Sequence, residues 1–230
     1  MENKANNLSD ELLREIEELG DNHIMTSIAT PLREDAFELS NEEKIARIKD
    51  YFEKIMHTLG LDLTDDSLRG TPKRVAKLYV NELFKGLAPE AKPSMSTFDN
   101  KYNYKQMLVE KNITLYSNCE HHFLPIVGKC HLAYIPNGRV IGLSKMNRIV
   151  DYYARRPQVQ ERLGIQILDE MKRALNTEDV AVYIDAEHMC VSSRGISDQS
   201  SSTVTVEYSG KFLEESTKNE FLAYIKDPLK

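Results

Sequence analysis

The stretch "MLVEKNITLYSNCEHHFLPIVGKCHLAYIPNG", residues 107–138, decides the kind of fold that the chain adopts. Its two ends, residues 107–117 and 126–136, are rich in β-branched and aromatic residues, and such runs favour strands. The Pro-Asn-Gly sequence after the second run is typical of a turn. Between the runs, cysteine, carboxylate and histidine side chains crowd into a few positions, which a segment that only filled a core would not need. We therefore expect two antiparallel strands whose connection carries chemistry.

The pattern after this pair changes to helices and then back to strands. Residues 143–156 and 157–175 have helical periodicity, and residues 180–191 and 201–212 again favour strands. Apolar residues four apart mark one side of the second helix: Val159, Leu163, Ile167, Met171 and Leu175. The order strand-strand-helix-helix-strand-strand predicts an α+β fold, with an antiparallel four-stranded sheet and two helices on one face.

The chain before residue 106 is predicted to be helical. A helix over residues 41–59 has an apolar stripe at Ile45, Ile48, Phe52, Ile55 and Met56. A further helix over residues 71–87 has Thr71 as its cap and Pro72 at its first helical position. Residues 87–105 are expected to form a loop. These helices would form a lobe beside the sheet.

Residues 9–20 predict a short amphipathic helix, in which Leu12, Ile16 and Leu19 recur near helical spacing, and residues 21–39 predict a linker. The expected domains are an N-terminal helical, flexible extension, a helical N-terminal lobe and a catalytic domain, at residues 1–40, 41–105 and 106–230.

Composition limits the classes of function. The chain has 230 residues, 41% of them hydrophobic, and a net charge of −6, which suits one sizeable domain and argues against nucleic-acid binding. No apolar run is long enough to span a bilayer, and the polar first residues lack the core of a signal peptide. We expect a cytoplasmic protein without a membrane partner. The odd count of 3 cysteines suits metal binding or a reactive thiol better than a disulfide framework.

The cysteines and histidines predict a metal site. Cys119 and His122, three apart, can hold one ion from a turn, and Cys190 in the strand over residues 180–191 supplies a third soft ligand. Strand alternation places that thiol on the inward face of its strand, together with Val182, Ile184, Ala186 and His188. Zinc favours thiolate and imidazole ligands; three protein ligands with a water describe a catalytic site, and four describe a structural one.

Both kinds of zinc site remain open at this point, because four further side chains could act as ligands: His121, His131, His188 and Cys130. The competing interpretation is a set of buried free cysteines and hydrogen-bonded histidines, which includes a Cys119–Cys190 disulfide in an oxidising setting. If three residues hold zinc, His121 and His188 adjoin the ligands and are the candidates for proton transfer. His131, inside a strand, has a structural role in this interpretation, and His23 and His57 are remote.

A phosphate site is predicted near residue 144. Ser144 stands at a helix start, Lys145 follows, and Arg148 comes one turn later, a favourable set for an anion. Arg194 lies just beyond Cys190, and Arg74 starts a helix. Any one of these cations alone is better explained as part of a solvated surface, and it is their placement around the metal segments that favours a phosphate site.

Gln160 and Glu161 lie in the first turn of a helix. The simple interpretation is that the carboxylate interacts with the helix dipole; the alternative is that it accepts N–H bonds from a guanine edge.

Three segments closely resemble the GTP cyclohydrolase I family, the zinc-dependent first enzymes of pterin and folate biosynthesis: "CEHHFLP", "HLAYIPNGRVIGLSKMNRIVDYYARRPQVQERL" and "EHMCVSSRG". The likeness runs from about residue 41 to 212 and is densest over 117–195, whereas the first forty residues show none. It implies a T-fold: subunits that assemble into a barrel, as a homodecamer of two face-to-face pentamers with active sites at subunit junctions. Such assembly would pair the open edges of a four-stranded sheet.

The resemblance also implies roles for single residues. Zinc would be held by Cys119, His122 and Cys190, with His121 and His188 as acid/base groups. The triphosphate of GTP would be held by Ser144, Lys145, Arg148, Arg194 and Arg74. The guanine would be read by Gln160 and Glu161, of which Glu161 anchors the N–H groups. The implied reaction opens the imidazole ring of GTP, releases formate, and then rearranges and recloses the ribose to 7,8-dihydroneopterin triphosphate. His121 and Ser144 are the candidates for the later proton transfers.

Three alternatives stay open. A different T-fold enzyme is the first, although pterin lyases of this fold use three histidines on zinc, and the deazaguanine reductase lacks this zinc set. A non-catalytic protein with structural zinc is the second, and Cys130 or His188 would then complete the metal shell. A regulatory protein that binds GTP without turning it over is the third, and the presence of both His121 and His188 speaks against it.

Overall fold

The structure is a computed structural model that describes residues 11, 14–15 and 26–226. The chain forms two compact units, Met1–Pro31 and Leu32–Lys230. Of the helix expected over residues 9–20, only Glu11, Arg14 and Glu15 are described, and these are helical. Its apolar residues lie outside the described part of the chain. All further elements belong to the second unit.

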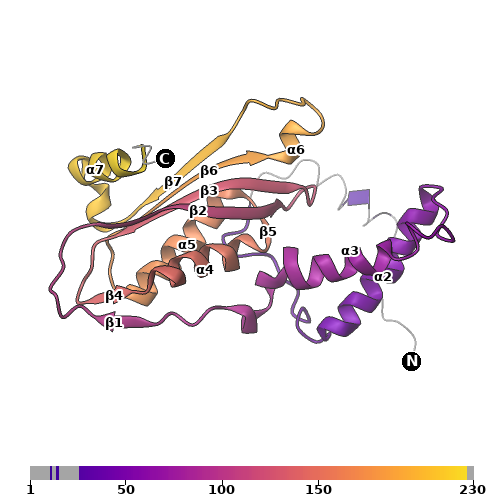
Figure 1. Ribbon diagram of the computed structural model, residues 1–230, viewed down its shortest axis with the longest axis horizontal. Coiled ribbons are helices and arrows are strands. Elements are labelled where there is room, and N and C mark those ends of the chain that lie inside the picture. Colours follow the sequence, from indigo (N-terminus) through magenta and orange to yellow (C-terminus); the bar gives the residue numbers. More distant parts are fainter. Residues whose placement is uncertain (1–10, 12–13, 16–25, 227–230) are drawn as a thin grey trace. The chain divides into compact units, whose positions relative to one another are not determined.

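A five-stranded sheet forms the centre of this unit (Figure 1), with strand order β5-β2-β3-β6-β7. The four long strands are antiparallel and agree with the predicted ones: β2 (Leu108–Cys119), β3 (Pro125–Tyr134), β6 (Val180–His188) and β7 (Thr203–Tyr208). The short β5 (Pro157–Gln158) is an addition, and it pairs in parallel with the Cys119 end of β2. The predicted α+β class with an antiparallel sheet is therefore confirmed.

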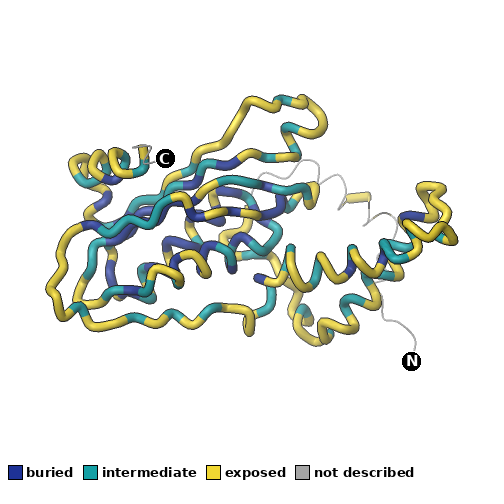
Figure 2. Tube along the Cα trace, in the orientation of Figure 1, coloured by how far each residue is buried: buried dark blue, intermediate teal, exposed yellow. Residues whose placement is uncertain are grey.

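Two helices cover one face of the sheet, as the sequence predicts: α4 (Leu143–Ala154) and α5 (Gln160–Leu175). The apolar stripe of α5 is fully buried, at Leu163, Ile167, Met171 and Leu175. These side chains pack with Leu115, Leu132 and Ile184 of the strands in the main core, which is the dark blue layer between helices and sheet in Figure 2. Burying each such side chain contributes roughly 1.5–3 kcal/mol, so this layer holds the sheet rigid.

The other face of the sheet is covered in part by the end of the chain, for which the sequence predicted no element after residue 212. There η4 (Gly210–Leu213) and α7 (Glu215–Lys226) bury Phe212 and Phe221 against Ala133 and Ala181. The loop expected over residues 87–105 is interrupted by two short regular elements, η3 (Pro89–Ala91) and β1 (Thr97–Asp99). β1 pairs with β4 (Arg139–Ile141) in a separate two-stranded sheet.

The helical lobe contains α2 (Asn41–Thr58) and α3 (Thr71–Leu78). α2 starts with a capping box, in which Ser40 and Glu43 satisfy each other's backbone N–H groups. The helix predicted over residues 71–87 is broken: α3 passes into a π-helix, η1 (Tyr79–Leu83), and a 3-10 turn, η2 (Lys85–Leu87). Gly86 in η2 contacts the end of α4 so closely that a Cβ would stand 2.0 Å from the carbonyl oxygen of Tyr152, so only glycine fits there.

Of the predicted stripe of α2 only Met56 is buried; Ile45, Ile48 and Phe52 are half-buried, and Ile55 is 50% exposed. It borders an apolar groove of about 670 Å³ that also takes in Phe52, Phe84 and Phe123. Among the residues that the structure describes, no helix combines the length and apolar character that a membrane crossing requires.

Candidate active site

The three predicted metal ligands meet at one end of the sheet. β2 ends at Cys119, β3 begins at Pro125, and β6 ends at His188 opposite Ile126, so the ends of three strands lie together. The ligand atoms of Cys119, His122 and Cys190 all lie within 4.8 Å of one another. Bond lengths of about 2.3 Å to sulfur and 2.0 Å to nitrogen place tetrahedral zinc ligands roughly 3.5–3.8 Å apart. The cluster therefore has the composition and spacing of a zinc site, after small adjustments.

The turn that carries two of these ligands is tightly held. The Phe123 N–H donates to the Cys119 carbonyl at 2.9 Å, and the Cys119 N–H donates to the Leu124 carbonyl at 2.8 Å. Closing this turn forces Phe123 to a φ of +54°, which is unfavourable for a residue with a side chain. Strain of this kind persists where the surrounding contacts determine the geometry, and it is common at functional sites.

Cys190 reaches the site by a different route from the one predicted. The sequence placed it on a strand, but β6 ends at His188 and Cys190 lies in the short helix α6 (Met189–Ser192). The pairing with β7 stops at Ala186, and that with β3 stops at His188, so nothing keeps the next residues extended. The prediction that the strand continues through Cys190 was wrong, although the Cys190 sulfur still lies in the cluster with Cys119 and His122.

The electrostatics of the cluster favour a cation. Burial raises the pKa of the Cys190 thiol, and the neighbouring Cys119 raises it further. A thiol whose ionisation is hindered in this way is stabilised as a thiolate by a divalent cation.

The remaining cysteine, Cys130, does not join the cluster. It is fully buried on β3 opposite Ile184, and burial raises its pKa. Since Ile126, four residues earlier on β3, is the residue opposite His188, Cys130 lies roughly 13 Å along the strand from the site. It therefore cannot serve as a fourth ligand, and this form of the structural-zinc alternative is excluded.

The histidines around the cluster have distinct partners. His121 Nδ1 lies 3.5 Å from the Cys119 sulfur. His122 Nε2 lies 2.7 Å from a guanidinium nitrogen of Arg194. A guanidinium can only donate, so the lone pair of His122 Nε2 faces Arg194.

His188 is the third histidine of the site. Its Nε2 lies 2.8 Å from Gln160 Oε1. Burial lowers its pKa, and the nearby charge of Glu161 opposes this only in part. His188 is therefore neutral near pH 7 and able to accept a proton.

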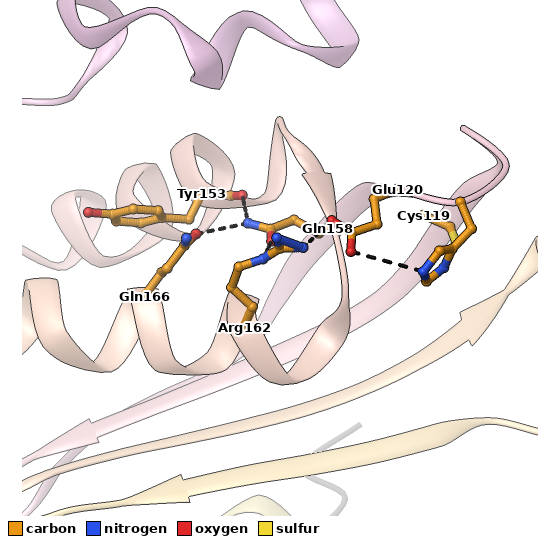
Figure 3. A network of polar contacts seen from close by, with 7 residues as sticks. Cys119, Glu120, Tyr153, Gln158, Arg162 and Gln166 are labelled. Carbon is orange, nitrogen blue, oxygen red and sulfur yellow. Dashed lines mark hydrogen bonds and ion pairs between the residues drawn. The ribbon is translucent and has the colours of Figure 1, made fainter. Parts of the chain in front are cut away.

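A buried polar network supports the metal turn, and sequence reasoning missed it (Figure 3). Arg162, 3% exposed, forms an ion pair with Glu120 and donates from Nε to Gln158 Oε1 at 3.2 Å. Gln158 in turn donates to the Tyr153 carbonyl at 2.8 Å and to Gln166 Oε1 at 2.9 Å. The sequence does carry a signal for this network: Gln158, Arg162 and Gln166 are four residues apart, so the predicted helix over 157–175 places these three polar side chains on one side.

The first turn of α5 also reaches the site, but its two predicted guanine readers differ. The Glu161 side chain is exposed and able to meet a ligand. Gln160 is 1% exposed and its amide is engaged by protein atoms, so in this conformation its side chain is not available to a guanine edge.

The predicted phosphate residues of α4 lie elsewhere in the same chain. α4 begins directly after β4, where the Ile141 N–H donates to the hydroxyl of Tyr134 at 3.2 Å. Tyr134 is the last residue of β3, at the opposite end from Pro125, roughly 30 Å from the metal turn. The exposed Ser144 and Arg148 and the partly buried Lys145 therefore do not meet the metal ligands within one chain.

The two other cations predicted to bind phosphate, Arg194 and Arg74, have different surroundings. Arg194 contacts His122 and belongs to the site. Arg74 contacts residues close to it in the sequence: its guanidinium donates to the Ser67 carbonyl at 3.0 Å and to Thr71 Oγ1 at 3.1 Å. His131 contacts the ring of Tyr183 and the backbone N–H of Asn112, in keeping with the structural role expected for it.

Known proteins resemble this chain along nearly its full length. A protein named GTP cyclohydrolase 1 from Flavobacterium johnsoniae is 63% identical over 211 residues, which cover 92% of this chain and 95% of that protein. Proteins of the same name from Aeromonas salmonicida and Yersinia pseudotuberculosis are each 49% identical over 200 residues, which cover 86% of this chain and 91% and 90% of theirs.

A solved structure, an archaeosine synthase QueF-Like in the apo form, aligns with 45% of this chain at 22% identity and a TM-score of 0.38, which is too low to add to the assignment. The family model described as GTP cyclohydrolase I matches residues 48–226, so the chain belongs to the GTP cyclohydrolase I family, whose members are metal-dependent T-fold enzymes that act on GTP.

Proposed function

We propose that this chain catalyses the reaction of its family on GTP: hydrolytic opening of the imidazole ring with release of formate, then rearrangement and ring closure to 7,8-dihydroneopterin triphosphate. The observation that carries the proposal is the cluster of Cys119, His122 and Cys190, with two histidines beside it and a cation at its edge. A purely structural site would need a fourth protein ligand, and Cys130 is out of reach.

The metal in this proposal is zinc, held by Cys119, His122 and Cys190. When bound, zinc supplies a Lewis acid and acidifies water at its open position. The side chains of the protein carry out the proton transfers. His188, neutral and half-buried, exchanges a proton with a nitrogen of the imidazole ring during the hydrolytic step. His121, in contact with Cys119, serves the later proton transfers, together with Ser144.

Substrate binding in this proposal uses more than one subunit. Glu161 and Arg194 reach the metal end of their own chain, where Glu161 anchors the guanine N–H groups. Ser144, Lys145 and Arg148, at the far end, would serve the site of a neighbouring subunit and hold the triphosphate there. The length of β3, roughly 30 Å between the metal turn and the end at which α4 begins, supports this reading, because one nucleotide cannot bridge both ends of the strand.

The proposed assembly is a homodecamer of two pentamers, whose sheets join into a barrel. Its support is the outer strand β7, on which Val204 and Val206 are 47% and 39% exposed. An edge strand with apolar side chains in the open is normally paired or covered. Arg74, bound within its own lobe, is the least supported of the proposed triphosphate ligands.

The proposal includes the division expected from the sequence: an extension (1–40), a helical lobe (41–105) and a catalytic T-fold domain (106–230). The expected compartment is the cytoplasm, where thiols stay reduced and available to a metal.

The test is an assay of formate and of fluorescent pterin, after oxidation, on the zinc-loaded protein with GTP. A chelated sample and a sample with ATP serve as controls. We expect both products with GTP, their loss on chelation and their return with zinc. A zinc-bound protein that binds GTP but releases no formate would refute the proposal and favour the GTP-binding regulatory alternative.

A further inference from the structure

The buried side chain of Gln160 connects three elements at the metal end of the sheet. Its amide nitrogen lies 2.9 Å from the Thr203 carbonyl, 3.1 Å from Thr205 Oγ1 and 3.3 Å from the Ile184 carbonyl. Its amide oxygen lies 2.8 Å from His188 Nε2. The first residue of α5 is thus tied to β6, to β7 and to a histidine beside the metal ligands.

These partners determine which way the amide faces. The carbonyl oxygens of Ile184 and Thr203 can only accept hydrogen bonds, so the atom that faces them must be the NH₂ group. The reversed amide would bring its oxygen against both carbonyl oxygens, where no hydrogen bond can form, and would lose these contacts. The orientation therefore follows from the network and does not depend on telling oxygen from nitrogen.

The orientation of the amide then determines the tautomer of His188. The Gln160 oxygen can only accept, so the Nε2 atom that faces it must carry a hydrogen. In the neutral ring the other nitrogen, Nδ1, is then the acceptor. A hydrogen bond on one ring nitrogen commonly fixes the role of the other in this way.

We propose that Gln160 is a positioning residue for the hydrolytic step: through Nε2 it fixes the ring orientation and tautomer of His188, so that Nδ1 is the atom that exchanges a proton with the substrate. This inference rests on the proposed function. It assigns Gln160 to His188 and leaves guanine recognition to Glu161. Thr205 supports the arrangement by accepting from the Gln160 NH₂ group.

The test compares two variants with the wild type, all loaded with zinc. Gln160→Met keeps the volume but removes the acceptor for His188 and the donors for β6 and β7. Thr205→Val removes one support and leaves the His188 contact in place, so it is the milder variant if Gln160→Met folds poorly. We expect Gln160→Met to lower kcat about 10- to 100-fold, the usual effect of losing a partner that orients a metal-site or catalytic side chain. Thr205→Val should lower kcat less, and both should keep KM for GTP within about twofold.

A second readout reports the tautomer directly. Nitrogen-15 NMR of histidine-labelled protein should show His188 protonated at Nε2 in the wild type and no such preference in Gln160→Met. A raised KM with unchanged kcat would overturn the inference in favour of guanine reading. Loss of zinc together with an equal loss of kcat would make Gln160 merely structural. Nδ1 protonation in the wild type would also overturn it. The NMR result does not depend on turnover, so an inactive wild-type protein would refute the proposed function while still testing the contact.

Discussion

The guanidinium of Arg162 forms an ion pair with the carboxylate of Glu120, and this contact ties the first turn of α5 to the turn that holds Cys119 and His122. Arg162 is almost fully buried, whereas Glu120 keeps one fifth of its side-chain surface exposed. Breaking a mostly buried pair leaves an uncompensated charge. The pair therefore affects both stability and the geometry of the metal turn.

Glu120→Gln should lower the free energy of unfolding by about 3 kcal/mol, because the buried Arg162 loses its counter-charge. It should also weaken zinc binding roughly 10- to 100-fold, since the turn loses its support. Denaturant unfolding and zinc competition with a chelator measure the two effects. Glu90→Gln, an exposed carboxylate of η3, is the matched control and should change neither. Unchanged zinc affinity in Glu120→Gln would show that the turn holds its shape without the ion pair.

His188→Ala should keep its zinc, but its rate of formate release should fall by a factor of at least about 100. The reason is that a proton-transfer group is removed while the three ligands remain. Metal analysis and the formate assay on the same sample separate the two outcomes. His57→Ala, in the exposed last turn of α2, is the control. If His188→Ala lost its zinc, His188 would be a ligand and its proposed role would be wrong.

Glu161→Ala should weaken GTP binding about 10-fold or more and leave ATP binding nearly unchanged, because guanine presents two adjacent N–H donors, N1–H and N2–H, to a carboxylate and adenine does not. Titration calorimetry with both nucleotides measures this. Asp169→Ala removes an exposed carboxylate from the same helix and should affect neither nucleotide. Equal weakening of GTP and ATP in Glu161→Ala would contradict a guanine-reading role.

Glu170 should make stability depend on pH. Burial by itself raises the pKa of this carboxyl, but the hydrogen bond and charge of Lys92, with Tyr153 and Arg173, outweigh burial and lower it below 4.5. A lowered pKa in the folded state means that the carboxylate stabilises the fold above the unfolded-state pKa, and that this contribution is lost as pH falls through the folded-state value.

Glu170→Gln should therefore reduce the free energy of unfolding by roughly 1.5–3 kcal/mol at pH 7, the usual range for hydrogen bonds to a charged group. The difference from the wild type should shrink below about pH 4. Urea unfolding at both pH values tests this. A difference that stayed constant with pH would mean that the Glu170 charge does not stabilise the fold.

Much of the fold could be predicted because its signals are local. The four long strands and the stripe on α5 follow from period-2 and period-3.6 patterns, and the metal ligands follow from cysteines and histidines at strand ends. The three residues of β1 carry too little pattern to reveal a strand, and the 3-10 turn η2 depends on the close approach of Gly86 to the end of α4, which the sequence does not show.

The polar part of the site was harder to predict because it depends on which strands become neighbours. The Ile184 and Thr203 carbonyls meet Gln160 only once β6 and β7 have paired. One signal was present: Gln160 lies four residues before Gly164 and seven before Ile167, on the buried side of α5, whereas Glu161 lies off that side. That spacing favours a buried side chain for Gln160 and an exposed side chain for Glu161.

The proposed zinc site is tested most directly by X-ray absorption at the metal of the zinc-loaded protein, with metal content measured on the same sample. We expect one zinc per chain, bound by two sulfur atoms, one imidazole and one oxygen from water. Cys119→Ala and Cys190→Ala should lose the metal, and Cys130→Ala should keep it with an unchanged spectrum. A zinc shell made of four protein ligands, or a metal lost from Cys130→Ala, would contradict a catalytic centre built from Cys119, His122 and Cys190.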